Sequence, residues 1–137
     1  MYPEQMTKPM AAELENAGFT SLKSAEDVSA VLDNKEGTVF LVVNSVCGCA
    51  ASNARPAAIS AIKNEKHPDK IVTVFAGVDS EAVAKAREYT FPYPPSSPSM
   101  AIFKDGKLVH MVERYMIEGK PIQMVANNLA AAFDEFC

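Results

Sequence analysis

The sequence predicts an α/β protein, a three-layer sandwich in which helices cover both faces of a mixed central β-sheet. The continuous β-branched and apolar run at 38–44 is typical of a strand that is buried on both faces. A helical segment and a second such run at 71–78 follow it, and a right-handed βαβ crossover makes these two strands parallel. Asp105-Gly106, between two short apolar runs, indicates a hairpin and therefore antiparallel strands as well.

The other elements follow from helical periodicity and from residues that begin or end helices. Ser24 has the position and chemistry of an N-cap, and Gly18 is a stop signal for the first helix. Pro9 and Pro121 fit the first turns of the first and last helices. The predicted helices are about 5–17, 25–32, 50–66, 81–89 and a last segment that begins at Pro121. The predicted strands are 38–44, 71–78, 100–103 and 108–112.

We expect a single domain over residues 1–137, because this length supports one hydrophobic core. The proline-rich segment 91–98 is too short to separate domains and is interpreted as a loop. Thirteen Lys and Arg against 17 Asp and Glu give a net charge of -4, which argues against nucleic acid and anionic membranes as partners. The chain has no apolar stretch of the ~20 residues that a membrane span needs, and its start lacks the features of a signal peptide. We therefore predict a cytoplasmic protein, a monomer or weak homodimer.

Cys47 and Cys49 lie between the end of the buried strand and the start of a helix. Unpaired backbone N–H groups and the helix dipole create a positive potential there, which favours the thiolate form of a cysteine. Gly48 is expected to let the backbone turn tightly and to leave the sulfurs exposed. A disulfide across so short a spacing would be strained and easily reduced. The pair therefore predicts a redox centre that cycles between dithiol and disulfide.

Two other interpretations of the cysteines remain open at this point. A buried cysteine is often an inert small hydrophobic residue, although two of them at a strand–helix junction fit this poorly. A site for copper or zinc would take its ligands from Cys47, Cys49, Cys137 and either His67 or His110. Structural zinc sites usually combine two spaced pairs of ligands, and the sequence has no second pair. We therefore predict no metal.

The cysteine junction, the later Ser97-Pro98-Ser99 and the hairpin together resemble thioredoxin. In thioredoxin a redox motif opens the first core helix, and a proline that follows a cis peptide bond faces this motif. The resemblance implies a cis bond before Pro98, where a sharp turn leaves nearby backbone groups free to pair with an extended substrate. The chain departs from thioredoxin in having Cys-Gly-Cys in place of Cys-x-x-Cys, and Val46 where a tryptophan usually stands.

A narrower resemblance accounts for these departures. The segment 44–56, Asn-Ser-Val-Cys-Gly-Cys-Ala-Ala-Ser-Asn-Ala-Arg-Pro, is similar to the bacilliredoxins, as are Ser-Pro-Ser and the C-terminal Phe-Asp-Glu-Phe-Cys. These are thioredoxin-like proteins of bacteria that use bacillithiol as their low-molecular-weight thiol. The resemblance implies a thiol–disulfide oxidoreductase that removes bacillithiol from protein cysteines. It also implies bacillithiol and S-bacillithiolated or disulfide-containing proteins as partners, with no further cofactor; the alternative activity is that of a disulfide isomerase or general thioredoxin-like reductase.

The resemblance also implies a role for each cysteine of the pair. Cys47 is the expected attacking thiolate, which takes bacillithiol from the substrate as a mixed disulfide. Cys49 is the expected resolving thiol, and free bacillithiol is the alternative to it. The residues predicted to contact the substrate are Ser97, Pro98, Gly48 and Arg55.

Some residues near the motif and at the chain end have two interpretations. Arg55 either steadies a thiolate or a bacillithiol carboxylate, or is a solvated surface residue. Cys137 is either a regulatory or second resolving thiol, or a mobile terminal residue with no role. Pro56 lies inside a predicted helix and is expected to kink it.

Overall fold

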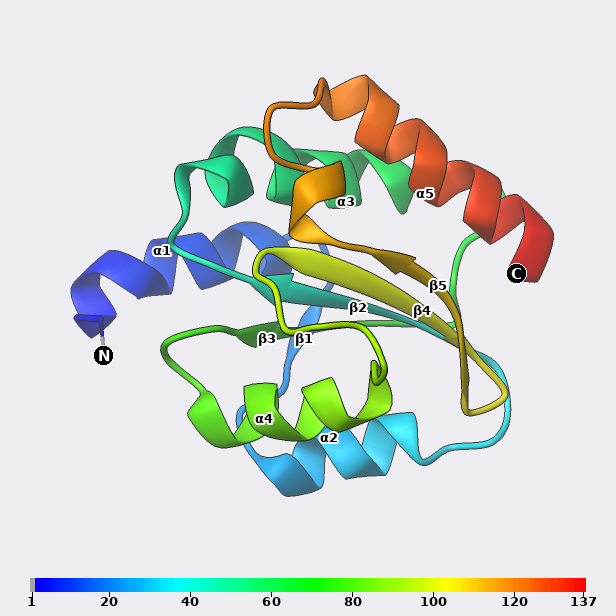
Figure 1. Ribbon diagram of the computed structural model, residues 1–137, viewed down its shortest axis with the longest axis horizontal. Helices are drawn as coiled ribbons and strands as arrows, with labels where there is room; N and C mark the ends of the chain where they lie inside the picture. The colour runs from blue at the N-terminus through cyan, green and yellow to red at the C-terminus, as the bar shows by residue number, and fades with distance from the viewer. Residues whose placement is uncertain (1) are drawn as a thin grey trace.

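A computed structural model describes residues 2–137 and has the predicted layers, with helices on both faces of a mixed sheet (Figure 1). The sheet has five strands in the order β1-β3-β2-β4-β5. The strands are β1 (Thr20–Ser21), β2 (Thr38–Asn44), β3 (Lys70–Phe75), β4 (Ser99–Lys104) and β5 (Lys107–Val112). The helices are α1 (Glu4–Glu15), α2 (Ala25–Leu32), α3 (Arg55–Ala61), α4 (Ser80–Tyr89) and α5 (Ile122–Phe136). A π-helical turn, η1 (Ala50–Ala54), precedes α3, and a 3₁₀ turn, η2 (Arg114–Met116), precedes α5.

Strand β2 lies at the centre of the sheet, and each of its residues is buried. It pairs in parallel with β3, as the βαβ crossover predicted, and it pairs antiparallel with β4. The register places Val43 opposite Ser99, so the end of β2 and the start of β4 lie at the same end of the sheet. Strand β5 pairs antiparallel with β4 and ends at that same end, because Val112 lies opposite Met100.

The two faces of the sheet carry separate hydrophobic cores. Helices α1, α3 and α5 cover one face, and α2 and α4 cover the other (Figure 1). Phe40 and Phe133 are fully buried in the first core. Their rings pack edge to face, with centroids 5.2 Å apart. Leu41 and Val28 are fully buried in the second core. Because Phe40 and Leu41 are neighbours in the chain, β2 contributes alternate side chains to each core.

The hairpin and the cap at Ser24 confirm the local sequence signals. Asp105 and Gly106 both have positive φ, 51° and 82°, which two-residue hairpin turns of type I′ require. The side chain of Ser24 accepts a hydrogen bond from the backbone N–H of Asp27 at 3.1 Å, so α2 begins where the cap predicted.

Several boundaries differ from the prediction. The predicted helix 50–66 is a π turn followed by the shorter α3, and Pro56 lies in the first turn of α3, where its missing N–H leaves no gap in the helix ladder. Pro9 lies inside α1 rather than in its first turn, and Pro121 is the N-cap residue of α5. Two short elements, β1 and η2, were not predicted, because elements of two or three residues are too short to show a period.

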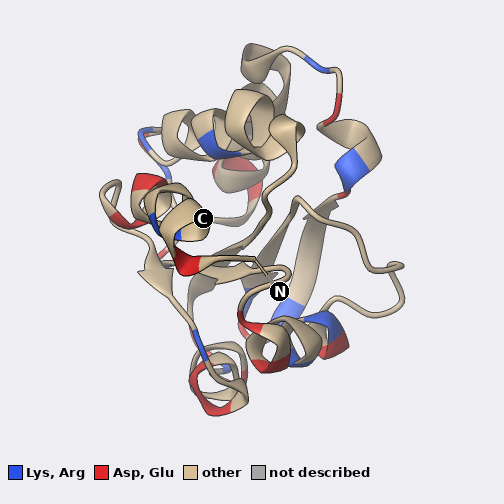
Figure 2. Ribbon diagram, turned by 90° about the vertical axis from the view of Figure 1, so that its left-hand side faces the viewer, with Lys and Arg blue, Asp and Glu red and all other residues tan. Residues whose placement is uncertain are grey.

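Charged residues of both signs are interspersed over the helices and loops (Figure 2). Within residues 2–137, no helix is both long enough and apolar enough to cross a membrane.

The core between α5 and the sheet gives the first testable prediction. Truncation of the fully buried Phe133 to alanine should lower the free energy of unfolding by about 3–5 kcal/mol, because it removes a large apolar side chain and leaves a cavity. Phe136→Ala, in the same helix but only partly buried, is the matched control and should cost clearly less. Urea denaturation of both variants measures the difference, and equal losses would contradict the assigned packing.

Candidate active site

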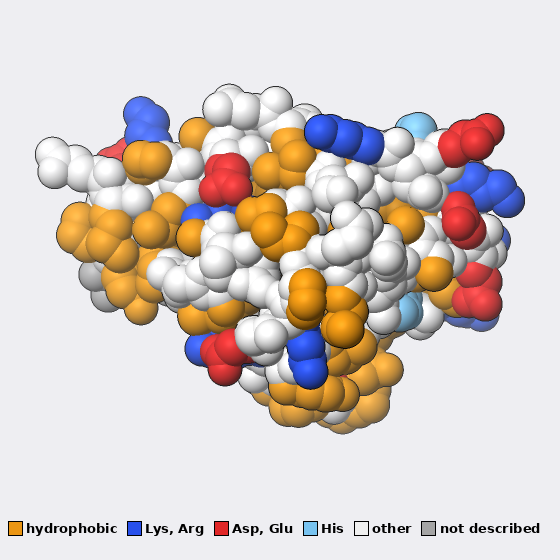
Figure 3. Space-filling view, turned by 90° about the horizontal axis from the view of Figure 1, so that it is seen from above, with side chains coloured by type: hydrophobic (Ala, Val, Ile, Leu, Met, Phe, Trp, Pro, Cys, Tyr) orange, Lys and Arg blue, Asp and Glu red, His pale blue; other side chains and the backbone are white. Residues whose placement is uncertain are grey.

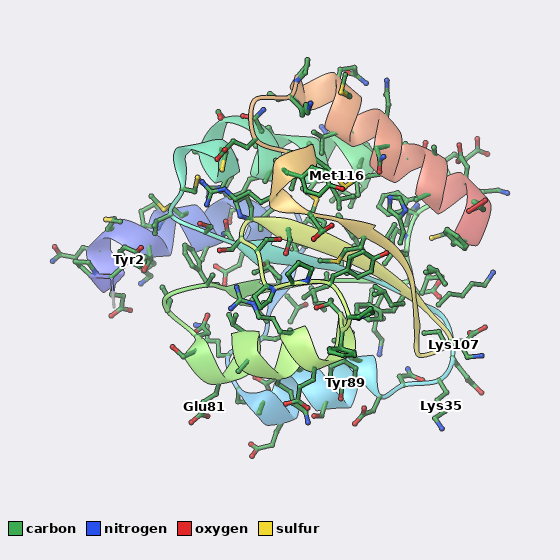
Figure 4. All side chains as sticks on the ribbon, viewed as in Figure 1. Tyr2, Lys35, Glu81, Tyr89, Lys107 and Met116 are labelled. Atoms are coloured by element: carbon green, nitrogen blue, oxygen red, sulfur yellow. The ribbon has the colours of Figure 1, made fainter. Side chains whose placement is uncertain are left out.

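The site lies at the end of the sheet where three strand termini meet. The chain leaves β2 towards Cys47, enters β4 from Pro98, and leaves β5 towards Arg114. Met116, labelled in Figure 4, marks the short turn η2 that carries Arg114. Residues that are far apart in the sequence therefore face one another here.

Cys47 lies directly before Gly48 and Cys49, the two helical residues that lead into η1. Its Sγ accepts a hydrogen bond from the backbone N–H of Cys49 at 3.4 Å, as a capping side chain does. Its own N–H donates to the hydroxyl of Ser45 at 3.0 Å, which orients the residue. Cys47 is partly exposed, Cys49 is buried, and both are free thiols. The sulfur that a partner molecule can reach is therefore that of Cys47.

The two thiols have pKa values shifted in opposite directions. The pKa of Cys47 is lowered, mainly by a hydrogen bond from the Cys49 side chain and further by the Cys49 backbone N–H and the charge of Arg114, while burial opposes this. Burial raises the pKa of Cys49 to about 11, and its hydrogen bond to Cys47 and the charge of Cys47 act in the same direction. At neutral pH the pair thus favours a thiolate on Cys47 and a proton on Cys49.

Arg114 links Cys47 to the loop before β4. One guanidinium nitrogen, Nη2, lies 3.2 Å from Sγ of Cys47, and Nη1 donates to the backbone carbonyl of Ser97 at 3.3 Å. Arg114 was not among the site residues predicted from the sequence. Its i, i+4 spacing to Glu118 signals an ion pair, but nothing in the local sequence shows that the segment faces a cysteine. Arg114 is the cation that favours the Cys47 thiolate.

Glu118 completes this cluster of charged groups. Its Oε2 accepts hydrogen bonds from Arg114 Nε at 3.0 Å and Nη2 at 2.7 Å, and these bonds lower the pKa of the carboxyl. Among the residues that the structure describes, the ligand-type atoms of Cys47, Cys49 and Glu118 lie within 4.8 Å of one another. The Arg114 guanidinium already contacts Cys47 and Glu118, so a metal ion would have to displace a cation. We therefore interpret the cluster as a site for thiol chemistry.

The residues that the sequence suggested as metal ligands do not lie close together in the structure. His67 Nδ1 lies 3.2 Å from the backbone carbonyl of Glu65, just after α3. His110 Nε2 lies 2.7 Å from the side-chain oxygen of Asn128 on α5. Neither histidine shares a site with the cysteine pair, so that interpretation was wrong about its ligands.

Cys137 lies at the opposite end of the sheet from the cysteine pair. Its neighbours are Thr38, Asp69 and Lys104, and burial raises its pKa. Thr38 begins β2, so the length of this strand, about 20 Å, separates Cys137 from the Cys47 end. Figure 1 shows the C-terminus at the far edge from the turn that follows β2. In this arrangement the sulfur of Cys137 does not meet those of the cysteine pair, and a regulatory or resolving role for Cys137 stays a prediction.

Arg55 is neither a solvated surface residue nor a group on the exposed face of the site. It is 3% exposed, and its guanidinium donates to Glu13 at 2.9 Å, to the side chain of Asn44 at 3.0 Å and to the carbonyl of Ser45 at 3.1 Å. The Asn44 amide in turn donates to the carbonyl of Met10. Arg55 therefore ties α1 and α3 to the end of β2, and it orients the loop that carries Cys47.

The remaining predicted site residues are Ser97, Pro98 and Gly48. Ser97 is linked to Cys47 through Arg114. The Ser97–Pro98 peptide bond is cis, as the resemblance implied, and so is Phe91–Pro92. Gly48 does not adopt positive φ, so the tight turn expected there does not depend on glycine. A Cβ at Gly48 would meet nothing within 4 Å, which leaves open space next to the motif.

Comparison with known proteins agrees with this geometry. The chain matches the disulphide isomerase family over residues 2–137. It is 58% identical over 135 residues to a bacilliredoxin of Cytophaga hutchinsonii, covering 98% of this chain and 99% of the relative. It is 52% identical over 137 residues to a bacilliredoxin of Geobacillus kaustophilus, covering 99% and 94%. The chain belongs to the bacilliredoxin family.

Solved structures with little sequence similarity share the fold. Thioredoxin of Fasciola hepatica superposes with a TM-score of 0.60 at 16% identity, covering 87% of this chain and 100% of that protein. Thioredoxin of Malassezia sympodialis gives a TM-score of 0.61 at 16% identity, with 87% and 90% covered. The fold is thus thioredoxin-like, and as a member of the bacilliredoxin family the protein is a thiol–disulfide oxidoreductase.

The contact between Arg114 and Cys47 predicts a change in thiol reactivity. In Arg114→Ala the pKa of Cys47 should rise, because a positive charge that favours the thiolate is lost. Alkylation of Cys47 by iodoacetamide at pH 7 should slow by about two- to fivefold, the size expected for one exposed charge pair. The pH profile of alkylation measures both effects. Lys107→Ala, at the distant hairpin, is the charge-matched control, and an unchanged midpoint in Arg114→Ala would contradict the assignment.

The buried contacts of Arg55 predict a loss of stability. Arg55→Ala should lower the free energy of unfolding by about 3 kcal/mol, because it leaves the buried Asn44 side chain without its cationic partner. Glu13→Gln, which keeps Arg55 bonded to Asn44 and Ser45, should cost much less. Urea denaturation tests both variants, and a loss below about 1 kcal/mol for Arg55→Ala would show that the network does not hold the loop.

Proposed function

We propose that this protein removes bacillithiol from S-bacillithiolated cysteines of other proteins in the cytoplasm, with Cys47 attacking and Cys49 resolving. The single observation that carries the mechanism is the pair of opposite environments described above. A partly exposed cysteine with a lowered pKa lies beside a buried cysteine whose pKa is about 11. The choice of bacillithiol is supported by relatives that are bacilliredoxins and match this chain over nearly its whole length.

The first step places bacillithiol on Cys47. The Cys47 thiolate attacks the bacillithiol sulfur of the mixed disulfide, a new S–S bond forms, and the substrate protein leaves as a thiolate that then takes a proton. Arg114 supports this step because it favours the thiolate of Cys47 before the attack. Cys49 remains a thiol meanwhile, and so it does not compete for the substrate.

The second step frees bacillithiol. Cys49 attacks Sγ of Cys47, a Cys47–Cys49 disulfide forms, and bacillithiol leaves as a thiolate. Two electrons pass from the cysteine pair to the mixed disulfide over the two steps. The chemistry uses only thiols and disulfides, so the proposal includes no metal and no resident cofactor.

Substrate proteins are proposed to contact the surface around Cys47. Tyr115, next to Arg114, is 71% exposed, and with Met124 it borders a hollow of about 290 Å³. Figure 3 shows hydrophobic side chains gathered in patches on this side of the molecule. The open space at Gly48 and the loop of Ser97 and Pro98 flank the sulfur, and they complete the proposed contact surface.

A substrate protein with one bacillithiolated cysteine tests the proposal. Wild-type protein should remove the adduct, and Cys47→Ser should retain less than about 1% of the rate, because the nucleophile is lost. Cys49→Ser should accumulate bacillithiol on Cys47, since no resolving thiol remains. Mass spectrometry of both proteins measures the transfer.

Cys137→Ser is the matched control for these variants, because it removes a cysteine distant from the site, and its rate should equal that of wild type. Removal of the adduct by Cys47→Ser at the normal rate would contradict the proposal.

Disulfide isomerisation is a second candidate function, favoured by the description of the matching family as disulphide isomerases. The same exposed thiolate on Cys47 can attack a protein disulfide in place of a bacillithiol adduct. Faster turnover of a protein with scrambled disulfides than of a bacillithiolated protein, at equal concentrations, would favour this second function.

A further inference from the structure

A carboxylate lies beside the thiol that must lose a proton. Sγ of Cys49 and the Glu118 carboxylate lie within 4.8 Å of each other, and Cys47 is within the same distance of both. Glu118 is held there by two hydrogen bonds from Arg114, at 2.7 and 3.0 Å. Its side chain is 55% exposed, so it can also exchange a proton with water. The carboxylate is therefore positioned between the resolving thiol and solvent.

The resolving step requires such a group. In the dithiol form the pKa of Cys49 is about 11, so about one Cys49 thiol in 10⁴ is ionised at pH 7. Burial, the largest cause of this raised pKa, still acts when Cys47 is in a mixed disulfide, so Cys49 remains mostly a thiol during resolution. Only the thiolate attacks a disulfide efficiently. The charged or titratable groups that face Cys49 are Cys47, Arg114 and Glu118. Once Cys47 is part of a mixed disulfide it has no charge and accepts no proton, and a guanidinium is only a donor, so Glu118 is the one of these three groups that can accept the proton. Because Arg114 lowers the pKa of Glu118, the protonated carboxyl is short-lived and passes its proton on.

We propose that Glu118 is a catalytic residue that accepts the proton of Cys49 while the mixed disulfide on Cys47 is resolved. This inference rests on the proposed function, because it assigns Cys49 as the resolving thiol. The Cys49 proton passes to a Glu118 carboxylate oxygen as the Cys49–Cys47 S–S bond forms. The bond from Cys47 to the leaving sulfur breaks, and that sulfur keeps the electron pair. Glu118 then returns the proton to the leaving thiolate or to water, so the sulfur of Cys49 is oxidised and the leaving sulfur is reduced.

A purely electrostatic role for Glu118 predicts the opposite result from a proton-accepting role. The negative charge of Glu118 raises the pKa of Cys49, so its removal alone would make the Cys49 thiolate more abundant and resolution faster. If Glu118 accepts the proton, its removal makes resolution slower. The sign of the change in Glu118→Gln therefore separates the two roles.

The test uses 4,4′-dithiodipyridine with the full chain carrying Cys137→Ser. One thiopyridone is released when Cys47 attacks, and a second is released when Cys49 resolves the adduct, so stopped-flow absorbance follows the two steps separately. In Glu118→Gln the second release should slow by about 100-fold at pH 7, the usual contribution of a general base. The first release, measured alone in Cys49→Ser, should change much less. Glu113→Gln, with the same loss of charge just before Arg114, is the matched control and should keep the wild-type second rate.

The pH dependence of the second release distinguishes a proton-accepting role of Glu118 from a purely structural one. The second release in Glu118→Gln should rise by about tenfold per pH unit, because it then depends on ionisation of Cys49 in water. Added acetate should restore the rate of Glu118→Ala in proportion to its concentration. A second release in Glu118→Gln that equals or exceeds the wild-type rate would overturn the proposal, and so would the absence of a second release in the wild type. A protein that rejects bacillithiolated substrates but shows both phases, slowed as expected, would contradict only the proposed function.

Discussion

The burial of strand β2 on both faces is the constraint on which the site depends. The strand lies between β3 and β4 in the sheet and contributes to both apolar cores, so it cannot shift by one residue without exchanging the side chains of the two cores. Its end at Asn44 is therefore held in place. The antiparallel neighbours β4 and β5 bring the cis Pro98 and Arg114 to that same end. The cysteine pair lies at this end of the sheet, where β2 and β5 end and β4 begins.

The different chemistry of the two cysteines follows from small differences in position at this strand end. Cys47 caps a helical segment and is reached by a guanidinium, whereas Cys49 is inside the first turn and buried. One environment favours a thiolate and the other favours a thiol, although a single glycine separates the residues. Because the nucleophilic Cys47 is partly exposed and the buried Cys49 stays protonated, the two sulfurs can react in sequence rather than together.

The two arginines show why sequence analysis found part of the site and missed the rest. Arg55 was considered for substrate contact because it follows the motif closely in the chain, yet the helical path turns it inward onto Glu13 and Asn44. Arg114 is separated from Cys47 by 67 positions, yet it reaches the sulfur. The strands, the hairpin and the cap at Ser24 were predictable because they depend on neighbouring residues. The π turn η1 was not predictable, because it interrupts the regular helical period. The short strand β1 was not predictable either, because it is defined by its pairing with β3.

The sequence by itself determined the α/β class, the order of the main elements and the presence of a reactive cysteine pair at a strand–helix junction. Periodicity, turn residues and helix termini are properties of adjacent residues, so they can be read without coordinates. Only the tertiary structure decided which thiol has the lowered pKa, which side chains surround it, and that Cys137 lies at the far end of the sheet. The physical reason is that desolvation and charge act through space, and the groups responsible come from segments that only the folded sheet brings together.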